Sequence, residues 1–237
     1  YTWTSASGQT FKDSHEHETQ TMTTAGVLAE SSNVGTVQTG EKLADDVRSN
    51  YMKRFGWGQA TGLEMPAEAA GIPYPPSSWD DRTRYTTMFG PGVAGTTLQS
   101  LPVLATVANK GEQMTPYLVS RTLDPDLNEV SPTSTQVART PIDSATASPL
   151  SSLMQTAVAE GTGTSAQVSG VQVAGKTGTA ETGTDSGPTT WFVGFAGTDI
   201  NKPEIALAVV LHGNAQTEDG ATGGQVAGPV APPVIAA

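Results

Sequence analysis

The sequence contains no cysteine, which excludes disulfide bonds and thiolate metal sites. Lysine and arginine number only 12 among 237 residues, against 23 aspartate and glutamate residues, so the net charge is −11. Because sequence-independent binding of nucleic acid needs many contacts from lysine and arginine to phosphates, this balance argues against a nucleic-acid partner. Long apolar runs are also absent, and none approaches a membrane span of about 18 residues.

The length suits one large domain or two small ones with a proper hydrophobic core. The two ends predict a piece of a longer chain. Residues 1–8 read like the middle of a domain, and residues 230–237 stop inside a stretch that is compatible with a helix. The absence of a membrane anchor from these residues therefore says little about the parent protein.

Apolar periodicity and the placement of glycine and proline predict helices first and strands afterwards. Helices are predicted over residues 21–30, 37–55, 97–108 and 149–160, and a loop rich in glycine and proline over 56–96. Strands are predicted as a pair over 114–130 with its turn at 124–126, and over 171–174, 190–196 and 205–211, with a connection over 131–148. Short glycine-rich connections favour antiparallel neighbours, so the predicted class is α+β, an antiparallel sheet flanked by helices.

Two histidines, His15 and His17, are candidates for a zinc site, because residues i and i+2 share one face of a strand. No third ligand of a suitable type lies nearby in the sequence. A solvated loop is therefore the favoured interpretation, and no metal site is predicted.

The stretch from Gly170 to Glu181 fits two motifs of different chemistry. Residues 170–177 match G-x-x-x-x-G-K-[ST], the phosphate-binding P-loop, and Lys176-Thr177-Gly178 matches the K-T-G of penicillin-binding proteins and serine β-lactamases. A P-loop needs a buried strand before it and a helix after it. The flanks here are rich in glycine, serine and threonine, which disfavours both elements and leaves nucleotide binding a remote alternative.

The K-T-G interpretation requires a strand that lines a cleft. Gly178 would allow a substrate backbone to approach closely, Lys176 supplies positive charge, and the Thr177 and Thr179 hydroxyls can hydrogen-bond a carboxylate. Upstream, Ser31-Ser32-Asn33 follows a predicted helix. These three polar residues fit an ordinary helix end or a set of groups presented to a cleft.

Taken together, these motifs resemble the transpeptidase domain of class B penicillin-binding proteins. Ser31-x-Asn33 and Lys176-Thr-Gly are similar to the second and third active-site motifs of that family. Further segments resemble the family in its usual order: residues 54–58 (RFGWG), 61–62 (TG), 89–92 (FGPG), 98–99 (LQ), 175–181 (GKTGTAE), 191–194 (WFVG) and 223–229 (GGQVAGP). The resemblance covers nearly the whole chain.

One part of the family pattern is missing, namely S-x-x-K, whose serine is the nucleophile. No lysine in this chain has a serine three positions before it, and the nearest imitation, Gln9-Thr-Phe-Lys12, has glutamine in that place. Residues 11–15 (FKDSH) resemble the family's stretch between the first two motifs. We therefore expect S-x-x-K on an upstream segment of the same protein, and a fold that is incomplete at its N-terminal side.

The resemblance implies a peptidoglycan D,D-transpeptidase. In the intact parent, the upstream serine would attack a D-Ala-D-Ala stem peptide, form an acyl-enzyme and pass the acyl group to a neighbouring stem peptide. Ser31 would relay protons with Lys176, Asn33 would orient the substrate, and Thr177, Gly178 and Thr179 would bind its end. β-Lactams would acylate the same serine, and no cofactor is implied. This chain alone is expected to be inactive.

Two alternatives share these motifs. A serine β-lactamase also has K-T-G, but class A enzymes use a glutamate to activate the deacylating water, and no Glu-x-x-Leu-Asn segment lies between the two motifs. A non-catalytic β-lactam sensor is the other. For a transpeptidase, the resemblance implies one domain over 1–237, with a helical part at about 20–160 and a sheet part at about 165–237. It also implies an extracytoplasmic location, an N-terminal anchor in the bacterial inner membrane, and cell-division or elongation partners.

Overall fold

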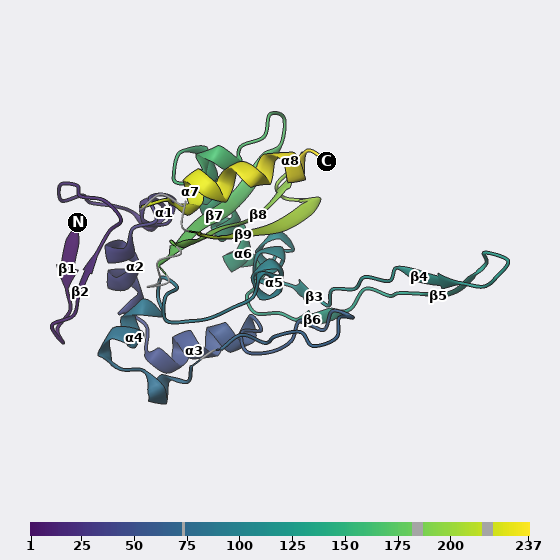
Figure 1. The fold of residues 1–237 in the computed structure, drawn as a ribbon, viewed down its shortest axis with the longest axis horizontal. Helices are drawn as coiled ribbons and strands as arrows, with labels where there is room; N and C mark the ends of the chain where they lie inside the picture. The colour runs from purple at the N-terminus through teal and green to yellow at the C-terminus, as the bar shows by residue number, and fades with distance from the viewer. Residues whose placement is uncertain (73, 182–186, 215–219) are drawn as a thin grey trace.

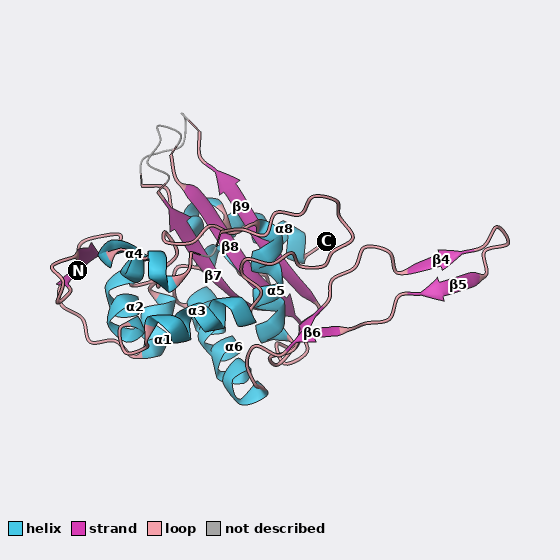
Figure 2. Cartoon of the chain, turned by 90° about the horizontal axis from the view of Figure 1, so that it is seen from below, coloured by secondary structure: helices cyan, strands magenta, loops and turns pink. Residues whose placement is uncertain are grey.

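The computed structural model describes residues 1–72, 74–181, 187–214 and 220–237 (Figures 1 and 2). The first half holds two short strands and most of the helices: β1 (Thr2–Thr4), β2 (Thr10–Lys12), α1 (Thr24–Ala29), α2 (Asn33–Gly40), α3 (Asp45–Arg54), η1 (Pro76–Ser78), α4 (Asp81–Thr86) and α5 (Thr97–Ala108). The second half holds β3 (Gln113–Met114), β4 (Arg121–Leu123), β5 (Glu129–Pro132), β6 (Val137–Arg139), α6 (Ser144–Ala159), η2 (Thr164–Ala166), β7 (Gln172–Ala180), β8 (Thr189–Gly197), β9 (Ile205–His212), α7 (Gly223–Val226), η3 (Gly228–Val230) and α8 (Ala231–Ile235).

The centre of the fold is an antiparallel sheet in the order β7-β8-β9, as predicted. The middle strand buries two phenylalanines that point to opposite faces. Phe195 packs with Leu104 of α5 and Met154 of α6 on one face. Phe192 packs with Ala227 and Ala231 from the C-terminal helices on the other. The sheet therefore lies between two helical layers, which confirms the predicted α+β class (Figure 2).

A second, smaller cluster ties the N-terminal hairpin to the helices. Phe11 of β2, Val37 of α2 and Tyr85 of α4 are buried together, and the Phe11 and Tyr85 rings have centroids 5.1 Å apart. This cluster fixes the end of β2 next to the start of α2. That position matters for function, because α2 begins at Asn33.

The β4–β5 hairpin extends far from the rest of the molecule, as Figures 1 and 2 both show. Every residue of its two strands is exposed. The Asp124 carboxylate accepts hydrogen bonds from the Asp126 and Asn128 backbone amides at 2.9 and 2.8 Å, which forms the turn. The predicted strand pair is confirmed in this part, whereas β3 pairs instead with β6, inside the predicted connection.

Some predicted boundaries were wrong for local reasons. The helix predicted over 37–55 is two helices, because α2 already begins at Asn33, where Ser32 Oγ accepts from Gly35 N, and α3 starts anew at Asp45. The helix predicted from Pro149 begins at Ser144, where Asp143 caps it, so the proline lies inside. The loop predicted over 56–96 contains α4.

The helices predicted over 21–30 and 97–108 are confirmed as α1 and α5. Within the described ranges no helix is long and apolar enough to cross a membrane.

Candidate active site

Ser31 occupies a strained turn between α1 and α2. Its φ angle is 56°, in the left-handed region that usually holds glycine at the end of a helix. The Ser31 amide donates to Leu28 O at 3.3 Å, and the Ser32 amide donates to Val27 O at 3.1 Å. These are the two bonds of a Schellman helix end, with serine in the glycine position. Of the two interpretations of this triplet, the helix end is thus real, yet strain at a polar residue is typical of functional sites.

Lys176 reaches this turn from the sheet. It lies on β7 on the same side as Ala174, which packs against α5 and α6. The Lys176 ammonium donates to Ser31 Oγ at 2.6 Å and to Thr177 O at 2.8 Å. Burial disfavours the charged ammonium and lowers its pKa from 10.5 to about 8. The structure therefore joins two residues, one from each predicted motif, that are 145 positions apart.

The two threonines of the third motif lie on the other side of β7. Thr177 is buried, and its Oγ1 lies 2.7 Å from Thr162 Oγ1. Thr179 is exposed, and its Oγ1 accepts from the Gly223 amide at 3.0 Å. Side chains alternate along a strand, so Lys176 and the two threonines lie on opposite faces of β7. A single ligand can reach both faces only at the free edge of the strand. A ligand that used all three would therefore lie along this edge.

Alternate main-chain groups of β7 also point to this edge. Because Lys176 Nζ bonds the Thr177 carbonyl, that carbonyl points away from β8. In an antiparallel pair this direction repeats every second residue, so the main-chain groups of Thr179 also point to the free edge. They are available to a ligand in an extended conformation.

Gly178 approaches another part of this chain closely. A Cβ atom placed on Gly223, at the start of α7, would lie 2.3 Å from Gly178 O. A Cβ on Gly178 itself would lie 3.2 Å from the Trp191 Cβ. Close packing of β8 is therefore one reason for glycine at position 178, and close packing of α7 on β7 is a reason for glycine at position 223.

Asn33 lies in the first turn of α2, and its Nδ2 donates to Lys12 O on β2 at 3.1 Å. It is thus held by the hairpin that carries Phe11. The structure brings Ser31 and Lys176 into direct contact and places Asn33 two residues after Ser31, at the start of α2, where it is held by Lys12 O.

Sequence reasoning missed Asp13, a buried carboxylate beneath the Ser31 turn. Asp13 Oδ2 accepts from Ser32 Oγ at 3.1 Å and lies 3.1 Å from His17 Nε2, and Asp13 Oδ1 accepts from Val34 N at 3.0 Å. A negative charge at this helix start stabilises it. The sequence feature that could have pointed to Asp13 was the resemblance of residues 11–15 to the family, but that resemblance assigned the aspartate no role. Both ring nitrogens of His17 have a partner, Asp13 Oδ2 for Nε2 and Glu18 O for Nδ1, so neither is free to bind a metal.

Among the described residues, no three histidine, aspartate or glutamate side chains gather as a metal site.

One threonine does stand three positions before a lysine, a T-x-x-K spacing that sequence reasoning overlooked. Thr39 lies in the last turn of α2, and its hydroxyl donates to Gly35 O at 2.8 Å. Lys42 is exposed beyond the end of that helix. A threonine whose hydroxyl closes its own helix is an ordinary surface residue, not a nucleophile beside Ser31.

The nucleotide-binding alternative is wrong for this geometry. Lys176 and Thr177 lie within β7 and pair with Val193 and Phe192 of β8. A P-loop binds phosphate with the amides of a loop and of the helix that follows. In the extended backbone of β7, successive amides point to opposite edges, so they cannot converge on one phosphate as the amides of a P-loop do.

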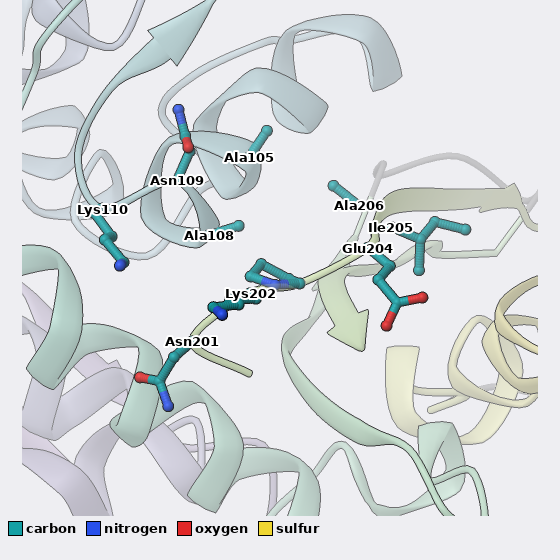
Figure 3. A pocket seen from close by; sticks show the side chains of 10 residues that line it. Ala105, Ala108, Asn109, Lys110, Asn201, Lys202, Glu204, Ile205 and Ala206 are labelled. Carbon is teal, nitrogen blue, oxygen red and sulfur yellow. The ribbon is translucent and has the colours of Figure 1, made fainter. Parts of the chain in front are cut away.

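A hollow of about 430 Å³ lies elsewhere, between the end of α5 and the start of β9 (Figure 3). Ala105, Lys110, Lys202 and Ile205 are among its lining residues. None of the lining residues belongs to the Ser31 turn or to residues 176–179, so this hollow is separate from the candidate site.

Comparison with known proteins agrees with this geometry. Residues 1–236 match the family model of the penicillin-binding protein transpeptidase domain. Penicillin-binding protein PbpB of Mycobacterium tuberculosis is 31% identical over 233 residues, which are 91% of this chain and 33% of that protein. Stage V sporulation protein D of Bacillus subtilis is 32% identical over 86% of this chain and 32% of its own length.

Solved structures of related proteins have a similar fold. A peptidoglycan synthetase from Bifidobacterium adolescentis has a TM-score of 0.86 and 33% identity over 98% of this chain and 42% of that one. Penicillin binding protein 3 of M. tuberculosis, complexed with aztreonam, has a TM-score of 0.83 and 29% identity over 97% of this chain and 53% of its own. The chain thus spans about a third of the curated relatives it matches. It belongs to the family of penicillin-binding protein transpeptidase domains, in its class B branch.

Proposed function

We propose that this chain contributes the S-x-N and K-T-G parts of a peptidoglycan D,D-transpeptidase active site. The observation that carries the proposal is the 2.6 Å hydrogen bond from Lys176 Nζ to Ser31 Oγ. It joins the two motifs through a partly buried ammonium and a hydroxyl held in a strained turn. The printed names of relatives support it, since PbpA of M. tuberculosis is called a peptidoglycan D,D-transpeptidase.

The reaction divides into groups that this chain supplies and one that it does not. A serine of an S-x-x-K segment outside these residues would attack the peptide carbonyl of D-Ala-D-Ala and form an ester. Ser31, hydrogen-bonded to Lys176, can both accept and donate a proton and would carry one to the leaving D-alanine amine. An amine of a second stem peptide would then take the acyl group and release the serine.

The edge of β7 would hold the substrate. Lys176 and the Thr177 and Thr179 hydroxyls would bind the terminal carboxylate, and Gly178 would leave room for the substrate backbone. The Thr179 amide would donate to the developing oxyanion, which fits its position on the free edge. Asn33 would orient the substrate through its amide. β-Lactams would bind and acylate in the same way, as the ampicillin and aztreonam complexes of a related protein support.

The two parts of the chain would work as one domain, with a helical part over about 20–160 and a sheet part over about 165–237. The packing of α5 and α6, from the helical part, on β7 and β8, from the sheet part, supports a single domain. The relatives' names, which refer to penicillin binding and to peptidoglycan, support an extracytoplasmic enzyme of the cell wall. An N-terminal helix outside these residues would anchor the parent protein in the bacterial inner membrane. Division or elongation proteins would be its partners.

The test is covalent labelling by fluorescent penicillin. Protein that includes the S-x-x-K segment should carry a stable adduct, which mass spectrometry maps to that serine, while residues 1–237 alone should carry none. An adduct on a serine within these 237 residues would show that the nucleophile is misplaced. If the longer protein gave no adduct, the proposed function would be wrong.

The fate of the β-lactam adduct distinguishes a transpeptidase from a β-lactamase and from a non-catalytic sensor. A transpeptidase should hold the adduct for many minutes and also join stem peptides from a D-Ala-D-Ala donor. Rapid hydrolysis of a chromogenic cephalosporin would indicate a β-lactamase. A stable adduct without any cross-linking would indicate a sensor.

A further inference from the structure

Thr162, in the loop between α6 and η2, contacts the K-T-G motif and the end of the helix that precedes the S-x-N motif. Its amide donates to Ala29 O at 3.0 Å, two residues before Ser31. Its Oγ1 lies 2.7 Å from Thr177 Oγ1. The first contact belongs to the end of α1 and the second to β7, so a single residue links the two elements whose side chains meet in the Lys176–Ser31 bond.

The loop is fixed on several sides. A Cβ on Gly161 would lie 2.2 Å from Ala29 O, and a Cβ on Gly224 would lie 2.4 Å from Thr162 O. Ser165 Oγ donates to Gly224 O at 2.5 Å. Backbone therefore packs directly against backbone around Thr162, and the position of its hydroxyl is set by the fold.

The direction of the Thr162–Thr177 hydrogen bond determines whether the Thr177 hydroxyl can also donate to a ligand. A threonine hydroxyl has one hydrogen to donate and two lone pairs, and an ionised carboxylate only accepts. If Thr177 donated to Thr162, it would have no hydrogen left for a carboxylate. If Thr162 donates to Thr177, the Thr177 hydrogen is directed to the ligand. Thr162 is exposed, so its oxygen can accept a hydrogen bond from water, whereas Thr177 is buried. The second direction therefore leaves the Thr177 hydroxyl hydrogen for a bound ligand.

We propose that Thr162 is a positioning residue that donates to Thr177 and thereby orients the Thr177 hydroxyl toward the terminal carboxylate of the substrate or β-lactam. The inference rests on the proposed function, because it assigns Thr162 to the same carboxylate site. It predicts a selective role: Thr162 matters for ligands with a free carboxylate and not for ligands without one.

The experiment compares acylation of the S-x-x-K-containing protein by a penicillin and by its methyl ester. Thr162→Val keeps the shape and removes the hydroxyl. It should lower the acylation rate constant for the free acid by about tenfold, because a hydrogen bond to a charged group is lost, and leave the ester rate within about twofold. Thr162→Ser, which retains the donor, should restore the acid rate.

Three further variants complete the test. In Thr177→Val the loss on adding Thr162→Val should vanish, because the two hydroxyls act as one unit. Ser165→Ala changes the adjacent η2 turn without removing a contact to Thr177, so it should affect acid and ester equally. Thr162→Ala must repeat the selective loss if Thr162→Val does not fold by circular dichroism. Equal losses for acid and ester, or a Thr162→Ser variant as slow as Thr162→Val, would overturn the inference. An unreactive wild type would instead count against the proposed function.

Discussion

Lys176 Nζ and Ser31 Oγ lie 2.6 Å apart, although one residue belongs to the sheet and the other to the turn between two helices. The bond joins a partly buried ammonium to a hydroxyl whose backbone, with φ of 56°, lies in the region that favours glycine. Strain and burial both cost stability. Their coincidence at one contact supports the proposed catalytic role of this pair.

Replacing Ser31 separates stability from activity. Ser31→Ala should lower penicillin acylation of the S-x-x-K-containing protein by about 100-fold or more, because a proton relay is lost. Ser31→Gly should lose activity to the same degree but raise the free energy of unfolding by about 1 kcal/mol, because glycine adopts positive φ without strain. Urea unfolding and gel fluorescence would measure the two effects. A glycine variant less stable than the alanine variant would contradict the claim of strain.

The pKa of Lys176 predicts how ligand binding depends on pH. With a pKa of about 8, the ammonium is charged at pH 7 and loses its proton as pH rises through 8. Non-covalent affinity for a peptide ending in D-Ala-D-Ala should therefore fall above pH 8, and calorimetry across pH 6.5–9.5 would show it. Constant affinity over this range would mean that Lys176 does not hold the carboxylate.

The same pKa makes Lys176 a destabilising residue at neutral pH. The unfolded lysine keeps its proton up to 10.5 and the folded one only to about 8, so between these values the unfolded state binds more protons and stability rises with pH. Lys176→Met should thus be more stable than wild type at pH 7, by about 1 to 3 kcal/mol. Its advantage should shrink at pH 9.5. Urea unfolding at both pH values tests this, and an advantage that grew with pH would refute the sign.

Asp13 should support the S-x-N turn. Asp13→Asn replaces one acceptor oxygen by a donor that faces the Ser32 hydroxyl or the Val34 amide. We expect a loss of about 1 to 3 kcal/mol in unfolding free energy, because a buried polar group is left unmatched, and slower acylation as the turn loosens. Glu16→Gln, an exposed change nearby, is the control and should alter neither measurement.

Gly223 should tolerate no side chain. In Gly223→Ala the new methyl would meet Gly178 O at 2.3 Å and Trp191 O at 2.5 Å, both backbone atoms that cannot rotate away. The start of α7 must then move off β7, and the Gly223–Thr179 bond breaks. A lower melting temperature with weaker β-lactam acylation is expected. Gly220→Ala, where a Cβ meets nothing within 4 Å but φ is +83°, serves as a control for backbone strain alone.

The sequence by itself determined the class and the motifs. The antiparallel sheet, the helix over 97–108 and the pairing of an S-x-N with a K-T-G all follow from local patterns, because apolar spacing and motif chemistry are written in neighbouring residues. Boundaries failed where a cap decided them, as at Ser32 and Asp143, since caps act through single side chains that periodicity does not register.

Only the tertiary structure decided which groups meet. Thr162 and Asp13 carried no motif, and their roles arise from contacts between segments distant in sequence. The lowered pKa of Lys176 comes from the packing of β7 against the helices, because desolvation exists only in the packed state. Local sequence specifies the elements, whereas the free edge of β7 and the groups gathered along it exist only after the layers have packed.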